Sequence, residues 1–126
     1  MKKKVLIIED DHSLLRLSQM ILSRKGYEAI AASSSMEAKR MLADDQGPDV
    51  IILDLMMPRE NGATFLNWLL EQPSPLCDTP VILNTAKTLS REEIDEFSKK
   101  CRKIILKGID FTEMLLAEVG SALSED

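Results

Sequence analysis

Cysteine and aromatic residues are scarce in this chain of 126 residues. The two cysteines, Cys77 and Cys101, lie in different segments without metal-ligand spacing, so we interpret them as reduced structural thiols rather than a disulfide or redox pair. Only 4% of the residues are aromatic. We expect Trp68 and the seven methionines to pack in the core and on helix faces rather than to form a cofactor site.

Long apolar runs and an excess of basic residues are also missing. No apolar run approaches the roughly 20 residues that span a bilayer. The apolar segment behind the basic residues 2–4 stops at Glu9, too early for a signal peptide. These features predict a cytoplasmic protein without a membrane segment. The net charge of -5 and the pI near 4.9 argue against direct nucleic-acid binding and favour a protein partner.

Residues 50–58 are the stretch around which the rest of the chain is organised. An apolar run over 50–53 ends at Asp54, and Pro58 then marks a turn. Such a run is typical of a strand that is buried on both faces of a parallel sheet. A carboxylate at the end of this strand needs a cation or polar groups beside it, because burying it alone is expensive.

Four further apolar runs predict strands at residues 5–8, 27–31, 81–84 and 104–106. Helices are predicted between and after the strands from apolar spacing and from start and stop signals. The stripe of the first helix, which ends at Gly26, is Leu14, Leu17, Ile21 and Leu22. The stripe of the third helix is Phe65, Leu66, Leu69 and Leu70. Capping-box spacing at residues 34–37, 90–93 and 110–113 opens the other three.

Strands that alternate with helices in this way predict an α/β fold in one domain over residues 1–126. We expect a flavodoxin-like, doubly wound sheet of five parallel strands in the order 2-1-3-4-5, with five helices. Ligand sites in such sheets lie outside the carboxyl ends of the strands. The polar residues that the strands deliver to this edge are Glu9, Asp10, Asp11, Asp54, Asn84, Thr85 and Lys107.

This set of side chains suits phosphoryl chemistry. Acids that crowd one sheet edge repel one another, and a hard divalent cation with oxygen ligands, commonly Mg²⁺, relieves the repulsion. The carboxylate of Asp54 is a competent nucleophile toward phosphorus and would give an aspartyl phosphate. The hydroxyl of Thr85 can donate a hydrogen bond to the transferred group, and Lys107 can act as a point charge on its oxygens.

At this point the chain resembles the receiver domain of two-component response regulators. The matching segments, in the family's order, are Glu9-Asp10, Asp54-Leu55-Met56-Met57-Pro58 with Gly62, Pro80-Val81-Ile82-Leu83-Asn84-Thr85-Ala86, and Lys107. The resemblance covers essentially the whole chain. Each segment alone is a weak signal, but the set is specific.

The resemblance implies a role for each of these residues. Asp54 would be the phosphoacceptor, charged by a histidine kinase or a histidine phosphotransfer protein, and the output would go to a downstream protein or a separate effector domain. The implied Mg²⁺ ligands are Glu9, Asp10, Asp54 and the backbone carbonyl of Met56. Thr85 would be the switch hydroxyl and Lys107 the contact to the phosphoryl group. Such a domain takes part in its own phosphorylation and dephosphorylation but is not an enzyme with a separate substrate.

Three positions depart from the family pattern. Ile104 stands where a tyrosine or phenylalanine usually couples to the switch hydroxyl, and Gly108 stands where a proline usually follows the lysine in a cis peptide. We expect a trans bond before Gly108, because a non-proline cis peptide costs about 2.5 to 4 kcal/mol. Asn84 stands where an apolar residue is common. These departures leave open an alternative function, a receiver-like docking domain that no longer switches on phosphorylation.

Two other folds with related chemistry fit less well. A phosphatase of the haloacid dehalogenase type needs a second acid two residues after its nucleophilic aspartate, and that position is Met56. A flavodoxin needs a phosphate loop rich in glycine and hydroxyl groups after the first strand, where this chain carries acids.

Overall fold

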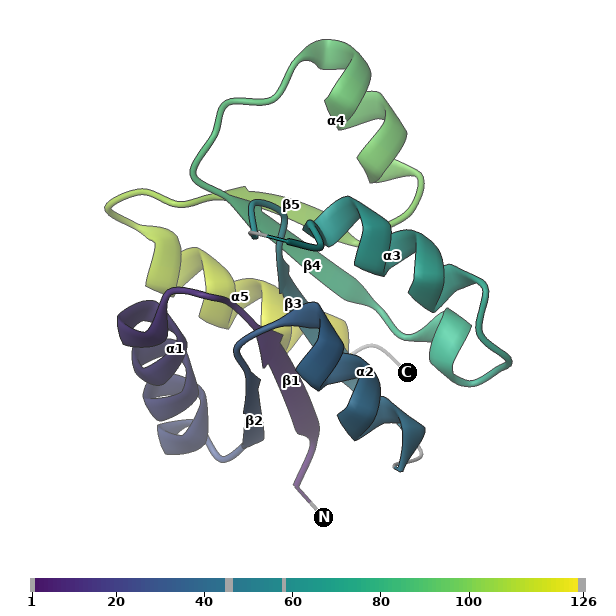
Figure 1. Ribbon diagram of the computed structural model, residues 1–126. Coiled ribbons are helices and arrows are strands. Elements are labelled where there is room, and N and C mark those ends of the chain that lie inside the picture. The colour runs from purple at the N-terminus through teal and green to yellow at the C-terminus, as the bar shows by residue number, and fades with distance from the viewer. Residues whose placement is uncertain (1, 45–46, 58, 125–126) are drawn as a thin grey trace.

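The computed structural model describes residues 2–44, 47–57 and 59–124. Its strands form one parallel sheet in the order β2-β1-β3-β4-β5 (Figure 1), as predicted. The strands are β1 (Lys4–Ile8), β2 (Glu28–Ala32), β3 (Val50–Asp54), β4 (Val81–Thr85) and β5 (Lys103–Leu106). The helices are α1 (His12–Arg24), α2 (Ser35–Ala43), α3 (Gly62–Leu70), α4 (Arg91–Ser98) and α5 (Phe111–Ser124), with a short 3₁₀ turn, η1 (Leu76–Asp78).

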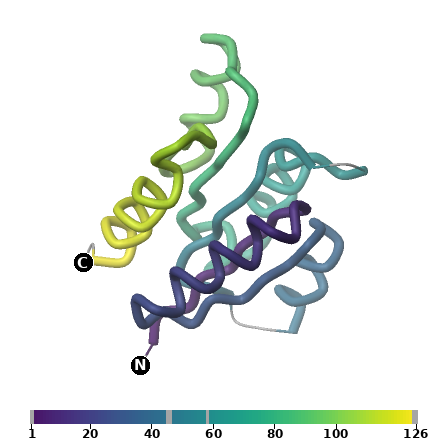
Figure 2. The backbone as a smooth tube through the Cα atoms, turned by 90° about the vertical axis from the view of Figure 1, so that its left-hand side faces the viewer, coloured from purple at the N-terminus to yellow at the C-terminus, as the bar shows by residue number. Residues whose placement is uncertain are grey.

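Helices cover both faces of the sheet, because the central strands are apolar on both sides. Helices α1 and α5 lie on one face (Figures 1 and 2). They bury Leu22, Leu115 and Val119 against alternate residues of the strands, such as Ile52 and Ile82. The other face packs against α2, α3 and α4. Within the described residues, no helix is both long and apolar enough to cross a bilayer.

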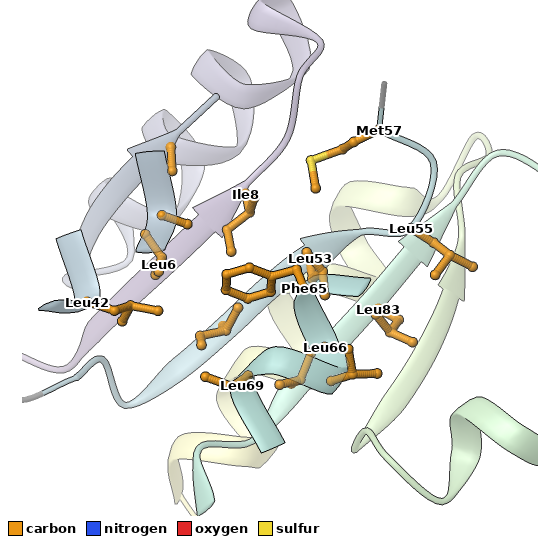
Figure 3. Close-up of a cluster of buried hydrophobic side chains, with 14 of the residues drawn as sticks. Leu6, Ile8, Leu42, Leu53, Leu55, Met57, Phe65, Leu66, Leu69 and Leu83 are labelled. Carbon is orange, nitrogen blue, oxygen red and sulfur yellow. The ribbon is translucent and has the colours of Figure 1, made fainter. Parts of the chain in front are cut away.

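Phe65 of α3 lies at the centre of the larger hydrophobic cluster. Figure 3 shows its ring between Ile8 and Leu53, with Leu66 and Leu69 on the same helix. All five side chains are fully buried. Burial of a large apolar side chain contributes about 1.5 to 3 kcal/mol, so this cluster fixes α3 and the end of β3 relative to each other.

Helix α4 is held much more loosely than α3. Phe97 is its one buried residue, whereas Ile94 is 44% exposed (Figure 1 shows the helix standing away from the sheet). A hydrogen bond from Lys100 Nζ to Asn67 Oδ1 (3.0 Å) ties its C-terminal end to α3. The loop between β4 and α4 therefore joins a rigid strand to a weakly anchored helix.

Most start and stop signals operate as expected. Gly26 has a φ of 96° and follows α1, where Tyr27 N donates to Leu22 O (3.2 Å) and Gly26 N donates to Ser23 O (3.0 Å). This pattern is a Schellman cap. Ser90 and Glu93 form the predicted capping box of α4.

The structure corrects several details of the sequence interpretation. Strand β2 is Glu28–Ala32 rather than 27–31, because Tyr27 N is used in the α1 cap. The box at 34–37 is only half formed: Ser34 caps Glu37 N, but Glu37 Oε1 accepts from Ser33 N (2.7 Å). Strands β1, β4 and β5 are each one residue longer than predicted.

The apolar stripe of α1 was also misjudged. Its buried residues are Leu15, Ser18 and Leu22, whereas Leu17 is 40% exposed. In α3, Phe65, Leu66 and Leu69 are buried as predicted, but Leu70 is 40% exposed. Both helices turn a narrower apolar face to the sheet than the number of leucines indicated. The turn at Pro58 lies outside the described residues.

Candidate functional site

The carboxyl ends of four strands bring polar side chains to one face of the sheet. Glu9 follows β1, Asp54 ends β3, Asn84 precedes the last residue of β4, and Lys107 follows β5. Side chains alternate along a strand, so each of these residues shares the face of the apolar residue two positions before it. Those residues are Ile7, Ile52, Ile82 and Ile105, and all pack in the cluster under α1 and α5.

Asp54 is almost fully enclosed at the end of β3. Only 2% of the residue is exposed. Its Oδ1 accepts a hydrogen bond from Met56 N (3.1 Å), which turns the chain after the strand. Its Oδ2 lies 3.4 Å from Lys107 Nζ. Both carboxylate oxygens therefore have a polar neighbour, as the sequence interpretation required.

Lys107 links two acids from different strands. Its Nζ lies 2.9 Å from Glu9 Oε1 and 3.4 Å from Asp54 Oδ2. Lys107 N donates to Thr85 O (2.9 Å), which continues the β4–β5 ladder by one residue and aims the side chain back across the sheet. Lys107 thus forms ion pairs with two of the acids at this edge of the sheet.

The pKa values of this cluster reflect burial and crowding. Burial raises the pKa of Asp54 to about 6, and the hydrogen bond and charge of Glu9 act in the same direction. Burial and a hydrogen bond with Asp54 also raise the pKa of Asp10. Burial opposes the charge on Lys107, but its contacts with Glu9 and Asp54 outweigh this effect and raise its pKa. The site holds more negative charge than Lys107 alone offsets.

Three carboxylates fit a hard divalent cation. One oxygen from each of Glu9, Asp10 and Asp54 lies within 4.8 Å of the other two. Oxygen-only ligands suit Mg²⁺, and among the described residues the three carboxylates face a single ammonium group, that of Lys107, which contacts two of them. The Met56 peptide adjoins the group through its hydrogen bond to Asp54. The donor set and its charge are therefore compatible with the predicted Mg²⁺ site.

Asp11 takes a different part from its two acidic neighbours. It is exposed, and its Oδ1 accepts from Ser13 N (3.0 Å) and Leu14 N (3.1 Å), so it is the N-cap of α1. Asp11 N in turn donates to Glu9 Oε2 (3.2 Å). The register Glu9-Asp10 thus faces the site and Asp11 caps the helix.

The hydroxyl of Thr85 is engaged in the β4–α4 loop. Its Oγ1 accepts from Lys87 N (3.1 Å) and contacts Lys87 O (3.4 Å). Thr85 lies on the face opposite Asp54, since Leu83 two residues earlier packs under α3. A contact between this hydroxyl and a group on Asp54 needs a rearrangement of the loop.

Gly62 lets the first turn of α3 approach the end of β3. A Cβ atom at this position would lie 2.5 Å from Asp54 O and 2.7 Å from Leu55 Cα. Gly62 N donates to Leu55 O (3.0 Å). These contacts hold Leu55, the residue before Met56, against the first residue of α3.

One arrangement near the site had no signal in the sequence. Lys39 of α2 lies 3.0 Å from Glu60 Oε1 and its Nζ is 5.2 Å from the centroid of the Trp68 ring. The hydrogen bond with Lys39 lowers the pKa of Glu60. This contact links α2, α3 and the loop after β3. The residues lie far apart in the sequence, so only the fold brings them together.

Comparison with known proteins identifies the family. The model of the response regulator receiver domain matches residues 5–118. The chain is 36% identical over 96 residues to the alkaline phosphatase synthesis transcriptional regulatory protein PhoP of Bacillus subtilis, covering 76% of this chain and 37% of PhoP. This chain belongs to the response regulator receiver family.

Two other receiver-family proteins match over nearly the full length. The chain is 31% identical over 125 residues to the polar-differentiation response regulator DivK of Brucella ovis, covering 97% of this chain and 100% of DivK. The response regulator TrrA of Thermotoga maritima, solved in complex with Mg²⁺-BeF, superposes with a TM-score of 0.80 at 25% identity. That match covers 95% of this chain and 98% of TrrA. The predicted receiver fold is therefore confirmed.

The structure shows the surroundings of the three residues that depart from the family pattern. Ile104 borders a groove of about 290 Å³ that Thr85, Lys87, Ile94 and Leu106 also line. Within the described residues the one cis peptide is Ser74–Pro75, so the bond before Gly108 is trans, as predicted. Asn84 is buried, and its Oδ1 has no hydrogen-bond partner among the residues described.

Proposed function

We propose that this receiver domain is a phosphoacceptor switch in which Asp54 takes a phosphoryl group from a phosphohistidine. The donor is a histidine kinase or a histidine phosphotransfer protein. The observation that carries the proposal is the group of Glu9, Asp10 and Asp54 oxygens within 4.8 Å, with Lys107 bound to two of these acids. The predicted cytoplasmic location fits a donor and an effector in the same compartment.

The transfer step follows from the chemistry of the carboxylate. An oxygen of Asp54 attacks the phosphorus and forms the bond of an acyl phosphate. The bond from phosphorus to the donor imidazole breaks, and its electron pair stays on the imidazole nitrogen. When bound, Mg²⁺ would offset the negative charge of the carboxylates and the incoming phosphoryl oxygens. Glu9, Asp10, Asp54 and the Met56 carbonyl would hold it.

The remaining residues position and stabilise the transferred group. Lys107 is a donor to phosphoryl oxygens, because its ammonium already lies beside Asp54 Oδ2. Thr85 becomes a further donor if the β4–α4 loop releases its hydroxyl from Lys87. That movement would link phosphorylation to the weakly anchored helix α4. The output is a change in affinity for a downstream protein or a separate effector domain.

The mass of the intact protein after incubation with acetyl phosphate tests this proposal. We expect a single phosphoryl adduct in the presence of Mg²⁺, and none with a chelator or in Asp54→Asn. A control variant, Asp95→Asn, alters an exposed acid of α4 and should retain the adduct. An adduct that persists in Asp54→Asn would place the acceptor elsewhere. If acetyl phosphate gives no adduct, a phosphorylated histidine phosphotransfer protein is the second donor to test.

A second candidate function is a receiver-like docking domain that does not switch. Ile104 and Gly108 favour it, because the usual aromatic and cis-proline elements are missing. The two candidates differ in the conformational effect of phosphorylation. Amide hydrogen exchange over residues 85–98, together with the sedimentation coefficient, should change with the phosphoryl adduct in a switch. Both should stay constant in a constitutive docking domain.

A further inference from the structure

Asn84 places an unpaired polar group directly beside the phosphoacceptor. Its Cα pairs with that of Asp54 in the β3–β4 register, and both side chains lie on the face under α1 and α5. The residue is 1% exposed. Its side-chain oxygen has no hydrogen-bond partner within the described part of the chain. A buried acceptor left unpaired is costly, so native structures rarely keep one without a reason.

The path of Lys107 explains which donor can reach this oxygen. Lys107 extends from the end of β5, yet its ammonium contacts Asp54 of β3 and Glu9 of β1. Neighbouring strands lie about 4.8 Å apart, so the side chain must cross β4. On this face of the sheet, Asn84 is the residue of β4 that stands between β5 and Asp54.

The resting partners of Lys107 are also two of the residues that fit a divalent cation. In the described residues its ion pairs are with Glu9 and Asp54. A cation shared by these carboxylates would withdraw their negative charge from the ammonium and would repel it. Lys107 then needs an acceptor that is not a metal ligand if it is to remain beside Asp54. A neutral carboxamide oxygen meets this requirement, since an ammonium group carries three donors.

We propose that Asn84 is a positioning residue for Lys107. Its side-chain oxygen accepts a hydrogen bond from the Lys107 ammonium when Glu9 and Asp54 bind a divalent cation. This inference rests on the proposed function. Asn84 contributes no ligand and touches no phosphoryl oxygen. It keeps the lysine in place, and it lowers the cost of removing Lys107 from Glu9. While Lys107 is paired with Glu9 and Asp54, the Asn84 oxygen is the acceptor left without a donor.

Calorimetric titration with Mg²⁺ tests this inference through a double-mutant cycle. The four proteins are the wild type, Asn84→Leu, Lys107→Met and the double variant. Leucine is close in size to asparagine but offers no acceptor. We expect Asn84→Leu to weaken Mg²⁺ binding about 10-fold, the value of one hydrogen bond to a charged group. In the Lys107→Met background the same substitution should change the affinity less than about 2-fold, because the ammonium that Asn84 would accept from is gone and the effects of two interacting residues are not additive.

Controls separate this role from simple packing. Ile82→Val alters the same face of β4 two residues before Asn84 and should leave Mg²⁺ affinity unchanged. If Lys107→Met fails to fold by circular dichroism, Lys107→Gln replaces it in the cycle. A loss of affinity that is equal in both backgrounds, or absent from both, would overturn the inference.

The wild-type titration distinguishes this inference from the function on which it rests. If the wild type binds Mg²⁺ and forms the Asp54 adduct but the cycle shows no coupling, only the role of Asn84 is overturned. If the wild type binds no Mg²⁺, both the metal site and the role of Asn84 are overturned together.

Discussion

The ammonium of Lys107 lies closer to Glu9 than to Asp54, at 2.9 Å against 3.4 Å. Glu9 is also one of the three acids that fit a cation, so a bound cation would compete with the lysine for the same carboxylate. In the metal-free domain Lys107 is a structural counterion. The role in phosphoryl transfer that we propose for Lys107 would therefore begin with the release of a buried ion pair.

The first prediction concerns this ion pair. Lys107→Met leaves Glu9 and Asp54 buried without their cation, and removal of one partner of a buried pair costs about 3 to 5 kcal/mol. We expect a loss near 3 kcal/mol in the free energy of unfolding, measured by urea denaturation with a chelator. Lys100→Met is the matched control, because Lys100 pairs with a largely exposed Glu96 (3.4 Å). That variant should lose less than about 1 kcal/mol, as surface pairs do. Equal losses in the two variants would contradict the buried-pair interpretation.

The second prediction uses the pKa of Asp54. Because burial and Glu9 raise this pKa to about 6, the folded state binds the proton more tightly than the unfolded state does. The protonated Asp54 therefore contributes fully to the stability of the folded state at a pH below about 3.8, its pKa in the unfolded state. That contribution is lost as the pH rises through 6. Asp54→Asn removes the charge, so it should stabilise the metal-free protein by up to about 3 kcal/mol at pH 7.5. The gain should fade toward pH 4.

Urea denaturation of both proteins across pH 4 to 8 measures this difference. Asp95→Asn, which alters an exposed acid on α4, should show no such dependence. Saturating Mg²⁺ should shrink the advantage of Asp54→Asn at pH 7.5, because a bound cation stabilises the carboxylate that the variant lacks. If the increase in unfolding free energy of Asp54→Asn does not depend on pH, ionisation of Asp54 does not destabilise the folded protein.

The third prediction concerns the close approach at Gly62. In Gly62→Ala the new Cβ would meet Asp54 O at 2.5 Å and Leu55 Cα at 2.7 Å, and both are backbone atoms that cannot turn aside. We expect a loss of at least about 2 kcal/mol in unfolding free energy, together with weaker Mg²⁺ binding, since the loop with Met56 must shift. Gly120→Ala in α5 is the control, because its Cβ would lie 3.9 Å from Tyr27 Oη. Helix propensity should make that variant neutral or more stable by about 0.5 to 1 kcal/mol.

The sequence was sufficient to predict the sheet and the edge where the site lies. The buried run before Asp54 and the polar residues that end the other strands have local signals, and the parallel topology brings those ends together. The predicted residues accordingly include the three clustered acids and Lys107. Strand ends were less certain. Tyr27, for example, has strand-like neighbours, but its N–H completes the cap of α1.

Other features depend on contacts that no local pattern encodes. The sequence could not show that Leu17 faces solvent, because this depends on the angle at which α1 packs on the sheet. It showed Asn84 as an unusual residue, but only the register places it beside Asp54 and only the fold leaves its oxygen unpaired. Likewise, Lys39 and Trp68 meet through the packing of α2 on α3.

The last prediction addresses the missing aromatic residue at position 104. Ile104 borders an open groove of about 290 Å³, so a larger side chain has room there. We expect Ile104→Phe to change the unfolding free energy by less than about 1.5 kcal/mol, the usual range for tolerated apolar substitutions. Its neighbour Ile105 is 1% exposed and packs under α5. Ile105→Phe should therefore lose about 1 to 3 kcal/mol of unfolding free energy through overpacking.

If Ile104→Phe destabilises as much as Ile105→Phe, the groove is not available to a side chain. If it is tolerated and enlarges the phosphorylation-dependent change in amide exchange over residues 85–98, the aromatic residue adds coupling that Ile104 lacks. In that case the domain switches through its loop and α4 with a weaker link than an aromatic side chain provides.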